Sequence, residues 1–247
     1  MRSARIRMRG GLGDFLPPGR REVESEAVFE LPVGLRDLIQ STGVPHVEVG
    51  RVLVDGEPAG WDRVVGGGEH VEAFPRYPLA TPPADPRLLL DVHLGRLARY
   101  LRLGGLDAAH FPDAGDPALV AASVGEDRIL LTRDRGLLMH AALREGSFVR
   151  STDPIEQAVE VVARFALGGR LVPFTRCMVC NHTLVPATRE EVAGLVPDGV
   201  LAAHDDYRRC PGCGRTYWRG SHQERLESLV RRMQGPGGPG GPGEEIP

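Results

Sequence analysis

The chain has 247 residues, a formal net charge of -3 and 41% hydrophobic residues, and all 30 of its basic residues are arginines. This length predicts two or three compact units. The absence of lysine excludes Schiff-base and P-loop chemistry. No apolar stretch approaches the roughly 18 residues of a membrane helix, and the N-terminus lacks the pattern of a signal peptide. We therefore expect a cytoplasmic protein that does not associate with membranes.

The first 78 residues predict a small mixed sheet with one helix. Alternating residues at 5–8 and 28–31 indicate a hairpin, 35–39 a short helix, and 47–54 and 69–74 further strands. This arrangement resembles the β-grasp, or ubiquitin-like, fold, and segment 52–74 is similar to the second half of the small sulfur carriers. Those carriers end in a free Gly-Gly, whereas this chain continues through Pro75 and Pro78. The resemblance therefore implies a docking module with a protein partner, not a carrier.

A proline-rich linker at 75–86 precedes a segment of different periodicity. Leu88, Leu89 and Leu90 form an apolar run typical of a buried parallel strand. A helix is expected at 94–101, ended by Gly104-Gly105, with Arg96, Arg99 and Arg102 on its other face. Strands at 107–111, 128–132 and 147–150 alternate with helices at 117–124, 135–144 and 154–165. This alternation predicts an open, parallel α/β sheet.

Acidic residues follow the predicted parallel strands, where ligands of such sheets bind. Asp91 ends the first strand, Asp116 lies after the second and Asp134 after the third, with Asp153 as a fourth candidate. Carboxylates without histidine or cysteine favour magnesium or manganese. Such ions catalyse the hydrolysis of phosphodiesters.

Helix capping is the alternative role for these acids. Asp116 and Asp153 each precede a proline, and Glu156 would complete a capping box with Asp153. Asp134 also fits a cap. Asp91 is different, because a carboxylate directly after three leucines is costly to bury without compensation. A metal role is therefore favoured most strongly for Asp91.

The only cysteines form two Cys-x-x-Cys pairs separated by 29 residues: Cys177, Cys180, Cys210 and Cys213. Four thiolates at this spacing complete the tetrahedral shell of a structural zinc ion. Two disulfides or thioredoxin-like redox motifs are the alternatives. They are disfavoured because no secretion signal is present and because Pro211, Gly212 and Gly214 suit a zinc knuckle.

Arginines and aromatics surround the second cysteine pair. We expect RNA contacts from Arg208, Arg209, Arg215 and Trp218, which can reach phosphates and stack on unpaired bases. Packing in the core is the alternative for the aromatic side chains. A capping box at Thr188 and Glu191 predicts a short helix, 221–233 a docking helix, and 235–247 a disordered tail.

Residues 87–218 resemble the Mut-seven C-terminal ribonuclease domain, a PIN-like nuclease fold with an appended zinc ribbon. The resemblance is carried by LLLDVHLGRLARYLRLGGLDA, EDRILLTRDRGLL, FVRSTDPIEQAVEVV, TRCMVCNHTL and CPGCGRTYW. Members of this family also occur with a ubiquitin-like domain in front. The implied domains are a β-grasp domain at 1–78, a PIN-like domain at 87–170, a zinc ribbon with a C-terminal helix at 171–234, and the tail.

The resemblance implies a ribonuclease that uses magnesium or manganese on single-stranded or structured RNA. Asp91, Asp116 and Asp134 would hold the catalytic metal, Arg133 would contact a phosphate, and zinc would be structural. Many relatives have a doubled acid where this chain has only Asp116, so the third ligand departs from the family pattern. The alternative is a non-catalytic RNA-binding or adaptor protein that docks partners through its β-grasp module.

Overall fold

The computed structural model describes residues 1–21, 23–218, 220 and 223–235. The chain divides into two compact units. The first unit combines Met1–Leu79 with Asp116–Phe148, and the second combines Ala80–Gly115 with Val149–Pro247. No helix in the described part is long and apolar enough to cross a membrane. The predicted tail lies, from residue 236 on, outside the described residues.

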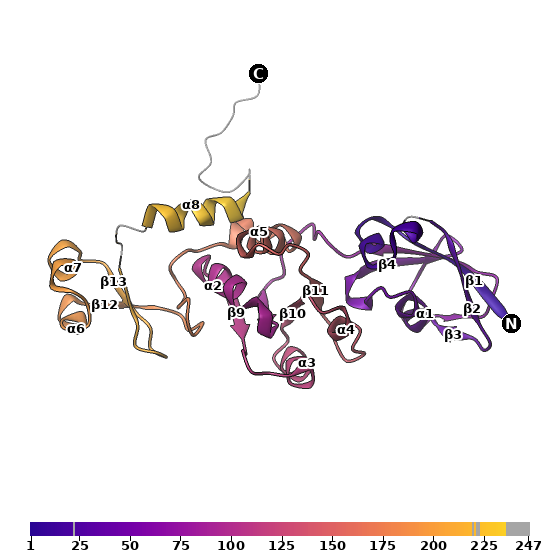
Figure 1. Ribbon diagram of the computed structural model, residues 1–247, viewed down its shortest axis with the longest axis horizontal. Coiled ribbons are helices and arrows are strands. Elements are labelled where there is room, and N and C mark those ends of the chain that lie inside the picture. Colours follow the sequence, from indigo (N-terminus) through magenta and orange to yellow (C-terminus); the bar gives the residue numbers. More distant parts are fainter. Residues whose placement is uncertain (22, 219, 221–222, 236–247) are drawn as a thin grey trace, which may run out of the picture. The chain divides into compact units, whose positions relative to one another are not determined.

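A five-stranded mixed sheet forms the N-terminal part of the first unit (Figure 1). Its order is β2-β1-β7-β4-β5, in which β1 and β7 are parallel and the other pairs antiparallel. Helix α1, Leu35–Ser41, buries Leu35, Leu38 and Ile39 in one core with Ile6 and Met8 of the sheet. The strands are β1 (Arg2–Met8), β2 (Ser25–Phe29), β4 (Val49–Val54), β5 (Glu57–Ala59) and β7 (His70–Pro75), beside a small pair of β3 (Val33–Gly34) and β6 (Val64–Val65).

The predicted pairing of the first two strands is confirmed, but they do not form a tight hairpin. Between β1 and β2 lie two 3-10 helices, η1 (Gly10–Phe15) and η2 (Pro18–Arg20). Leu12 and Phe15 of η1 are buried in the core of the sheet. The connection therefore contributes apolar side chains to the core of this sheet.

The rest of the first unit comprises α3 (Asp116–Gly125), β10 (Ile129–Thr132), α4 (Arg135–Leu138) and β11 (Gly146–Phe148), with β10 and β11 parallel. The predicted helix at 135–144 is wrong in length, because α4 ends at Leu138. Backbone carbonyls beyond that point accept hydrogen bonds from the β-grasp side chains. Gln40 Nε2 donates to Met139 O at 2.9 Å, His46 Nε2 lies 2.9 Å from Leu143 O, and Arg36 donates to Ala141 O. Tertiary partners thus replace the helical hydrogen bonds of this segment.

Buried polar groups join the same segment to the N-terminal sheet. The carboxylate of Glu48, which is 1% exposed, accepts hydrogen bonds from Phe148 N at 2.5 Å and Ser147 Oγ at 3.3 Å. Arg135 donates to Phe15 O and Asp14 O and lies over the rings of Phe15 and Phe148. These contacts explain why 116–148 and the N-terminal sheet form one compact unit.

His46 should make the stability of this unit depend on pH. Burial lowers the pKa of His46, and its Nδ1 is buried without a hydrogen-bond partner among the described residues. A proton on Nδ1 would therefore favour the unfolded chain. Since the folded-state pKa lies below the usual 6.5, the free energy of unfolding should fall as the pH drops from 7 through 6.5 and below.

Urea unfolding at pH 7 and pH 5 tests this expectation. The His46→Gln variant, whose amide can donate to Leu143 O without titrating, should show a smaller loss of stability between the two pH values. An equal loss in the variant and the parent protein would contradict the role of His46. His93, which is exposed, provides a matched control as His93→Gln.

The second unit begins with parallel strands and helices. β8 (Arg87–Leu90) pairs with β9 (Asp107–His110), and between them lie η4 (Val92–Leu94) and α2 (Gly95–Leu103). As predicted, α2 ends at Gly104-Gly105; Gly105 has φ +86°, and a Cβ there would lie 2.2 Å from Val172 O. Later come α5 (Pro154–Arg164) and η5 (Gly168–Arg170). With the parallel pair of β10 and β11, these elements confirm the predicted α/β class.

A three-stranded antiparallel ribbon follows in the second unit, in the order β12-β13-β14. The predicted capping box is confirmed, because Thr188 and Glu191 cap α6 reciprocally. Helix α8 packs against α5 and buries Val230 and Met233, as expected for a docking helix. The remaining elements are β12 (Val185–Ala187), α6 (Arg189–Val192), α7 (Asp198–Ala203), β13 (Tyr207–Arg209), β14 (Thr216–Trp218) and α8 (Gln223–Gln234).

Candidate metal centre and acidic site

The sulfur atoms of Cys177, Cys180, Cys210 and Cys213 all lie within 4.8 Å of one another. Cys177 Sγ is 3.6 Å from Cys213 Sγ, and Cys180 Sγ is 3.2 Å from Cys210 Sγ. These separations are much longer than a disulfide bond of about 2.05 Å, and all four cysteines are free. Four sulfurs at such distances fit a metal ion such as zinc, whose tetrahedral bonds to sulfur measure about 2.3 Å.

Both cysteine pairs sit on turns of the same geometry. Asn181 and Gly214, which directly follow the second cysteine of each pair, have φ +71° and +72°. Each donates its N–H to the carbonyl of the first cysteine, Asn181 to Cys177 at 3.0 Å and Gly214 to Cys210 at 2.9 Å. The left-handed residue turns the chain so that both sulfurs of a pair face the same point. The sequence indicated this turn only at the second pair, through Gly214. The structure shows the same turn at the first pair, where Asn181 adopts a conformation that asparagine tolerates.

Hydrogen bonds prepare one of the sulfurs for metal binding. Burial works against ionisation of Cys177, yet hydrogen bonds from the Tyr217 hydroxyl and from backbone N–H groups lower the pKa of this thiol to about 6. Burial and proton sharing with Cys210 raise the pKa of Cys180 to about 12. These hydrogen bonds favour the thiolate form of Cys177, and a dication would displace the protons of the other thiols.

Arg102 links the first knuckle to the parallel strands, a role that the sequence pattern did not indicate. It is 5% exposed, so its predicted placement on the outer face of the helix is wrong. Its Nε donates to Ala108 O at 2.8 Å and its Nη1 to Val179 O at 2.8 Å. Burial lowers the pKa of Arg102, whereas the electrostatic influence of the nearby Cys177 and Cys180 raises it. The guanidinium therefore offsets part of the negative charge of the cysteine cluster.

Asp91 directly follows β8 and is 5% exposed. It caps η4 by accepting a hydrogen bond from His93 N at 3.3 Å. A carboxylate so close to an apolar strand requires compensation of its charge, and Asp91 has a further interaction besides the bond from His93 N. A carboxylate binds metals through its oxygens, and oxygen ligands suit a hard cation such as Mg²⁺ or Mn²⁺.

Asp134 and Asp153 are both helix caps with nearly identical hydrogen bonding. Asp134 Oδ1 accepts from Gly136 N at 2.6 Å and Leu137 N at 3.4 Å. Asp153 Oδ1 accepts from Ile155 N at 2.9 Å and Glu156 N at 3.0 Å. Both side chains are exposed, and Oδ2 of Asp134 has no hydrogen-bond partner in the described part of the chain. Capping therefore leaves one oxygen of Asp134 available.

The capping box predicted for Asp153 and Glu156 is wrong. Glu156 forms an ion pair with Arg232 of α8, and Asp153 N donates to Ser151 Oγ at 3.3 Å. The partner of Glu156 is 76 residues away, so the local pattern gave no signal for it.

Asp116 is the exposed first residue of α3. It belongs with Asp134 to the first unit, whereas Asp91 and Asp153 belong to the second. Within neither unit, over the residues described, do three acidic side chains lie as close together as the four cysteines do. A shared metal site for Asp91, Asp116 and Asp134 is therefore a proposal.

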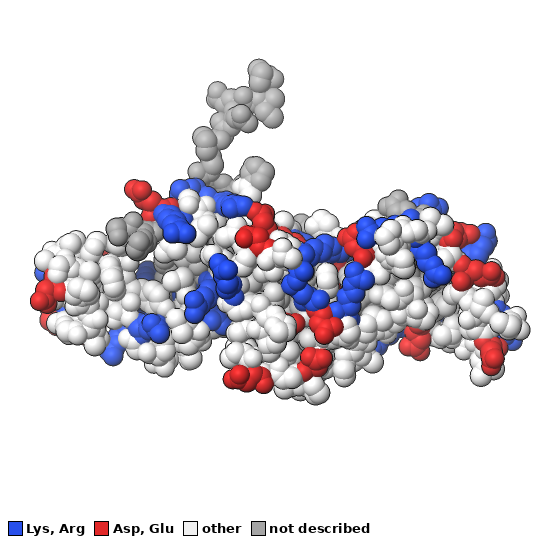
Figure 2. All heavy atoms as spheres, viewed as in Figure 1, with Lys and Arg blue, Asp and Glu red and all other residues white. Residues whose placement is uncertain are grey.

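The residues predicted to contact RNA differ in exposure. Arg133, Arg209 and Arg215 are exposed, Trp218 is 38% exposed and Arg208 is half-buried. Basic and acidic atoms are interspersed on the face visible in Figure 2.

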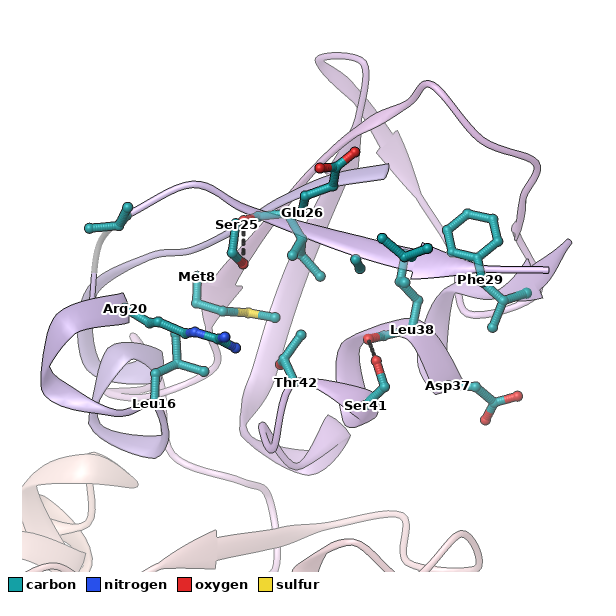
Figure 3. Close-up of a pocket in the computed structure, with 15 residues that line it drawn as sticks. Met8, Leu16, Arg20, Ser25, Glu26, Phe29, Asp37, Leu38, Ser41 and Thr42 are labelled. Atoms are coloured by element: carbon teal, nitrogen blue, oxygen red, sulfur yellow. Dashed lines mark hydrogen bonds between the residues drawn. The ribbon is translucent and has the colours of Figure 1, made fainter. Parts of the chain in front are cut away.

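The N-terminal domain contains a cavity of about 260 Å³ beneath β2 and beside α1 (Figure 3). Apolar side chains such as Met8, Leu16 and Leu38 form much of its wall. The Ser41 hydroxyl donates to Leu38 O at 2.7 Å and the Ser25 hydroxyl to Ile6 O at 3.4 Å.

These features define a mixed α/β protein with a ubiquitin-like N-terminal sheet, parallel strands followed by acidic residues, and a four-cysteine ribbon. The chain belongs to the Mut7-C RNAse domain family, whose model matches residues 86–230. The model described as Mut7-C ubiquitin matches residues 1–79. Both matches confirm the predicted family and its order of domains. No curated protein and no solved structure matches the chain.

Proposed function

We propose that this protein is a ribonuclease that hydrolyses phosphodiester bonds in RNA with the aid of Mg²⁺ or Mn²⁺. Membership of a nuclease family supports the reaction class. The observation that carries the proposal is Asp91, a carboxylate only 5% exposed directly after an apolar strand. Asp116 and Asp134 are the further proposed ligands, while Asp153 is assigned to capping α5.

A metal bound by these oxygens would activate water and offset charge at the phosphate. Backbone N–H groups of the protein orient the two carboxylates. His93 N–H fixes the carboxylate of Asp91, and the N–H groups of Gly136 and Leu137 fix Asp134 through Oδ1. Arg133, exposed beside Asp134, can pair with a phosphate of the substrate. Preset carboxylates need little reorganisation when substrate binds.

The proposal assigns nuclease chemistry to 87–170 and RNA positioning to the ribbon at 171–234. A zinc ion held by the four cysteines would be structural, because a four-sulfur shell leaves no open coordination position. The β-grasp domain at 1–78 would serve docking. We place the protein in the cytoplasm because free thiols persist in reducing compartments.

A non-catalytic RNA-binding or adaptor protein is the second candidate. It is favoured by the capping bonds of Asp134 and Asp153, which give both acids a structural role without any metal. In that case the protein would use the family fold only to bind RNA or a partner, and none of the acidic residues would take part in catalysis.

Cleavage of labelled single-stranded RNA, with DNA of the same sequence beside it, distinguishes the two candidates. The full chain should cleave RNA with Mn²⁺ or Mg²⁺, and Asp91→Asn should lower the rate by about 100-fold or more, because several kcal/mol of charge stabilisation are lost. Asp127→Asn is a matched control, since Asp127 is exposed, precedes β10 and has φ +52°, a conformation that asparagine tolerates. Parental activity in Asp91→Asn would remove the proposed site, and no cleavage with either metal would favour the adaptor.

A further inference from the structure

A cavity of about 700 Å³ lies in the second unit beside the ribbon. Its volume falls within the range of sites that bind small organic groups. Trp218 and Tyr217 of β14 line it together with apolar side chains that include Leu184 and Leu226. The sequence indicated Trp218 but not the cavity, because the lining residues come from segments far apart in the chain.

Two polar side chains in the cavity wall lack partners. The guanidinium of Arg208 makes no hydrogen bond or ion pair with any described residue, although the side chain is half-buried. The Thr216 hydroxyl is buried and likewise has no hydrogen-bond partner in the described part of the chain. Arg176, which also lines the cavity, is already paired with Asp107 at 3.7 Å. Asp206 also lines the cavity and is likewise not free, so Arg208 is the cation of this wall that has no partner among the described residues.

The cavity reaches both faces of the ribbon at its edge strand, β14. Arg208 lies opposite Tyr217 across β13 and β14, so these two side chains project from one face, whereas Thr216 and Trp218 project from the other, and all four line the cavity. Trp218 is 38% exposed and thus presents part of its ring to an incoming ligand. A cavity wall with two aromatic rings and a guanidinium that lacks a partner among the described residues suits a ligand that combines an aromatic ring with a negative charge.

We propose that this cavity binds an unpaired base of single-stranded RNA. Trp218 provides the stacking surface, Arg208 pairs with the adjoining phosphate, and the Thr216 hydroxyl bonds to the edge of the base. The choice of RNA as the ligand rests on the proposed function. A base within a duplex is stacked and paired, so its ring cannot enter such a cavity without flipping out of the helix. The ribbon would therefore select single-stranded substrate.

Fluorescence of Trp218 tests this proposal in the full chain. The protein has two tryptophans, so Trp61→Phe leaves Trp218 as the only indole. Adding Asp91→Asn and omitting divalent cations prevents cleavage during the titration. A short single-stranded oligouridine RNA should quench the emission to saturation. The same RNA annealed to its complement should quench it much less, and inorganic polyphosphate should leave it unchanged.

Binding of fluorescently labelled oligouridine, measured by anisotropy, tests the individual side chains. Trp218→Leu should weaken binding by about 5- to 100-fold, the effect of losing one base stack. Arg208→Gln should weaken it by about 3- to 10-fold, the effect of one charge-assisted hydrogen bond. Arg63→Gln, which removes an exposed charge from the N-terminal domain, should have no effect. Zinc content and the unfolding midpoint show whether each variant is folded.

Two results would overturn the proposal. One is equal quenching by polyphosphate, which would indicate electrostatic contact without a base. The other is unchanged affinity of folded Trp218→Leu and Arg208→Gln variants for the RNA. These outcomes are distinct from failure of the proposed function. Saturable quenching without cleavage would retain the binding site and reject the nuclease, whereas cleavage without quenching would reject only the binding site.

Discussion

Replacement of Cys210 by serine is expected to abolish stoichiometric zinc binding and to unfold the ribbon. Cys210 is 1% exposed, and the small core around it contains Cys177 and Leu184, with Cys180 and Tyr217 packed against it. The strands also pack against a second small core of Val192, Val196 and Tyr207. Two cores of this size cannot stabilise three short strands without a metal. Zinc binding to structural sites contributes about 10 to 16 kcal/mol of apparent free energy, and most of it depends on a complete ligand set.

Atomic absorption measures the zinc content, and hydrogen exchange of residues 177–218 measures the order of the ribbon. The parent protein should contain about one zinc ion per chain, and Cys210→Ser should contain a small fraction of that and exchange rapidly over the ribbon. Val179→Ser is a suitable control, because Val179 lies within the first Cys-x-x-Cys turn but its side chain is 44% exposed. Full zinc content in Cys210→Ser, or well under one zinc in the parent protein, would contradict the assignment.

Loss of zinc should also loosen the end of the parallel strands next to the ribbon. Asn181 Nδ2 donates to Asp107 Oδ1 at 2.8 Å, and Ala108 N donates to Asn181 Oδ1 at 3.1 Å. Arg102 adds hydrogen bonds from α2 to the carbonyls of Met178 and Val179. Because these bonds hold β9 to the first knuckle, an unfolded knuckle leaves buried donors and acceptors of β9 without partners.

Features that depend on nearby residues could be predicted from the sequence. The two cysteine pairs, the end of α2 at Gly104 and the capping box at Thr188 each arise within a few residues, and the structure confirms them. Features that depend on distant residues could not. The turns predicted beyond Leu138 are absent, and the carbonyls of Met139 and Leu143 in that segment instead bind side chains 99 and 97 residues away. Arg102 donates to Ala108 O nearby, but its other two acceptors, the carbonyls of Met178 and Val179, lie 76 and 77 residues further along the chain.

The candidate sites show the same limit. The cysteine cluster was predictable, since metal-ligand spacing within each pair is a local property of one turn. The cavity beside Trp218 was not, because it is formed by segments between Leu103 and Leu226. For the acids, the sequence indicates both a cap and a metal ligand, and the two roles use the same side-chain oxygens. Hydrogen bonding alone cannot separate them, because Asp134 and Asp153 cap their helices alike.

Substitution of these two caps by asparagine should therefore separate capping from metal binding. Asparagine caps helices about as well as aspartate, so the free energy of unfolding should change by less than about 0.5 kcal/mol in Asp134→Asn and in Asp153→Asn. Asparagine is neutral and binds a divalent cation much more weakly than a carboxylate does. Asp134→Asn should thus lower the rate of metal-dependent RNA cleavage by about 100-fold or more. Asp153→Asn should retain close to the parental rate.

Urea unfolding and a cleavage assay over a range of Mn²⁺ concentrations measure both effects on the same preparations. If Asp134 binds metal, the variant should also require more Mn²⁺ for half-maximal activity, a shift that a loss of stability cannot produce in a folded enzyme. Equal cleavage rates in the two variants would show that Asp134 is only a cap. Strong loss of activity in both variants would instead make Asp153 a fourth member of the acidic site. Asparagine at position 153 can keep both capping hydrogen bonds that Asp153 Oδ1 accepts, so the loss would have to come from removal of the negative charge.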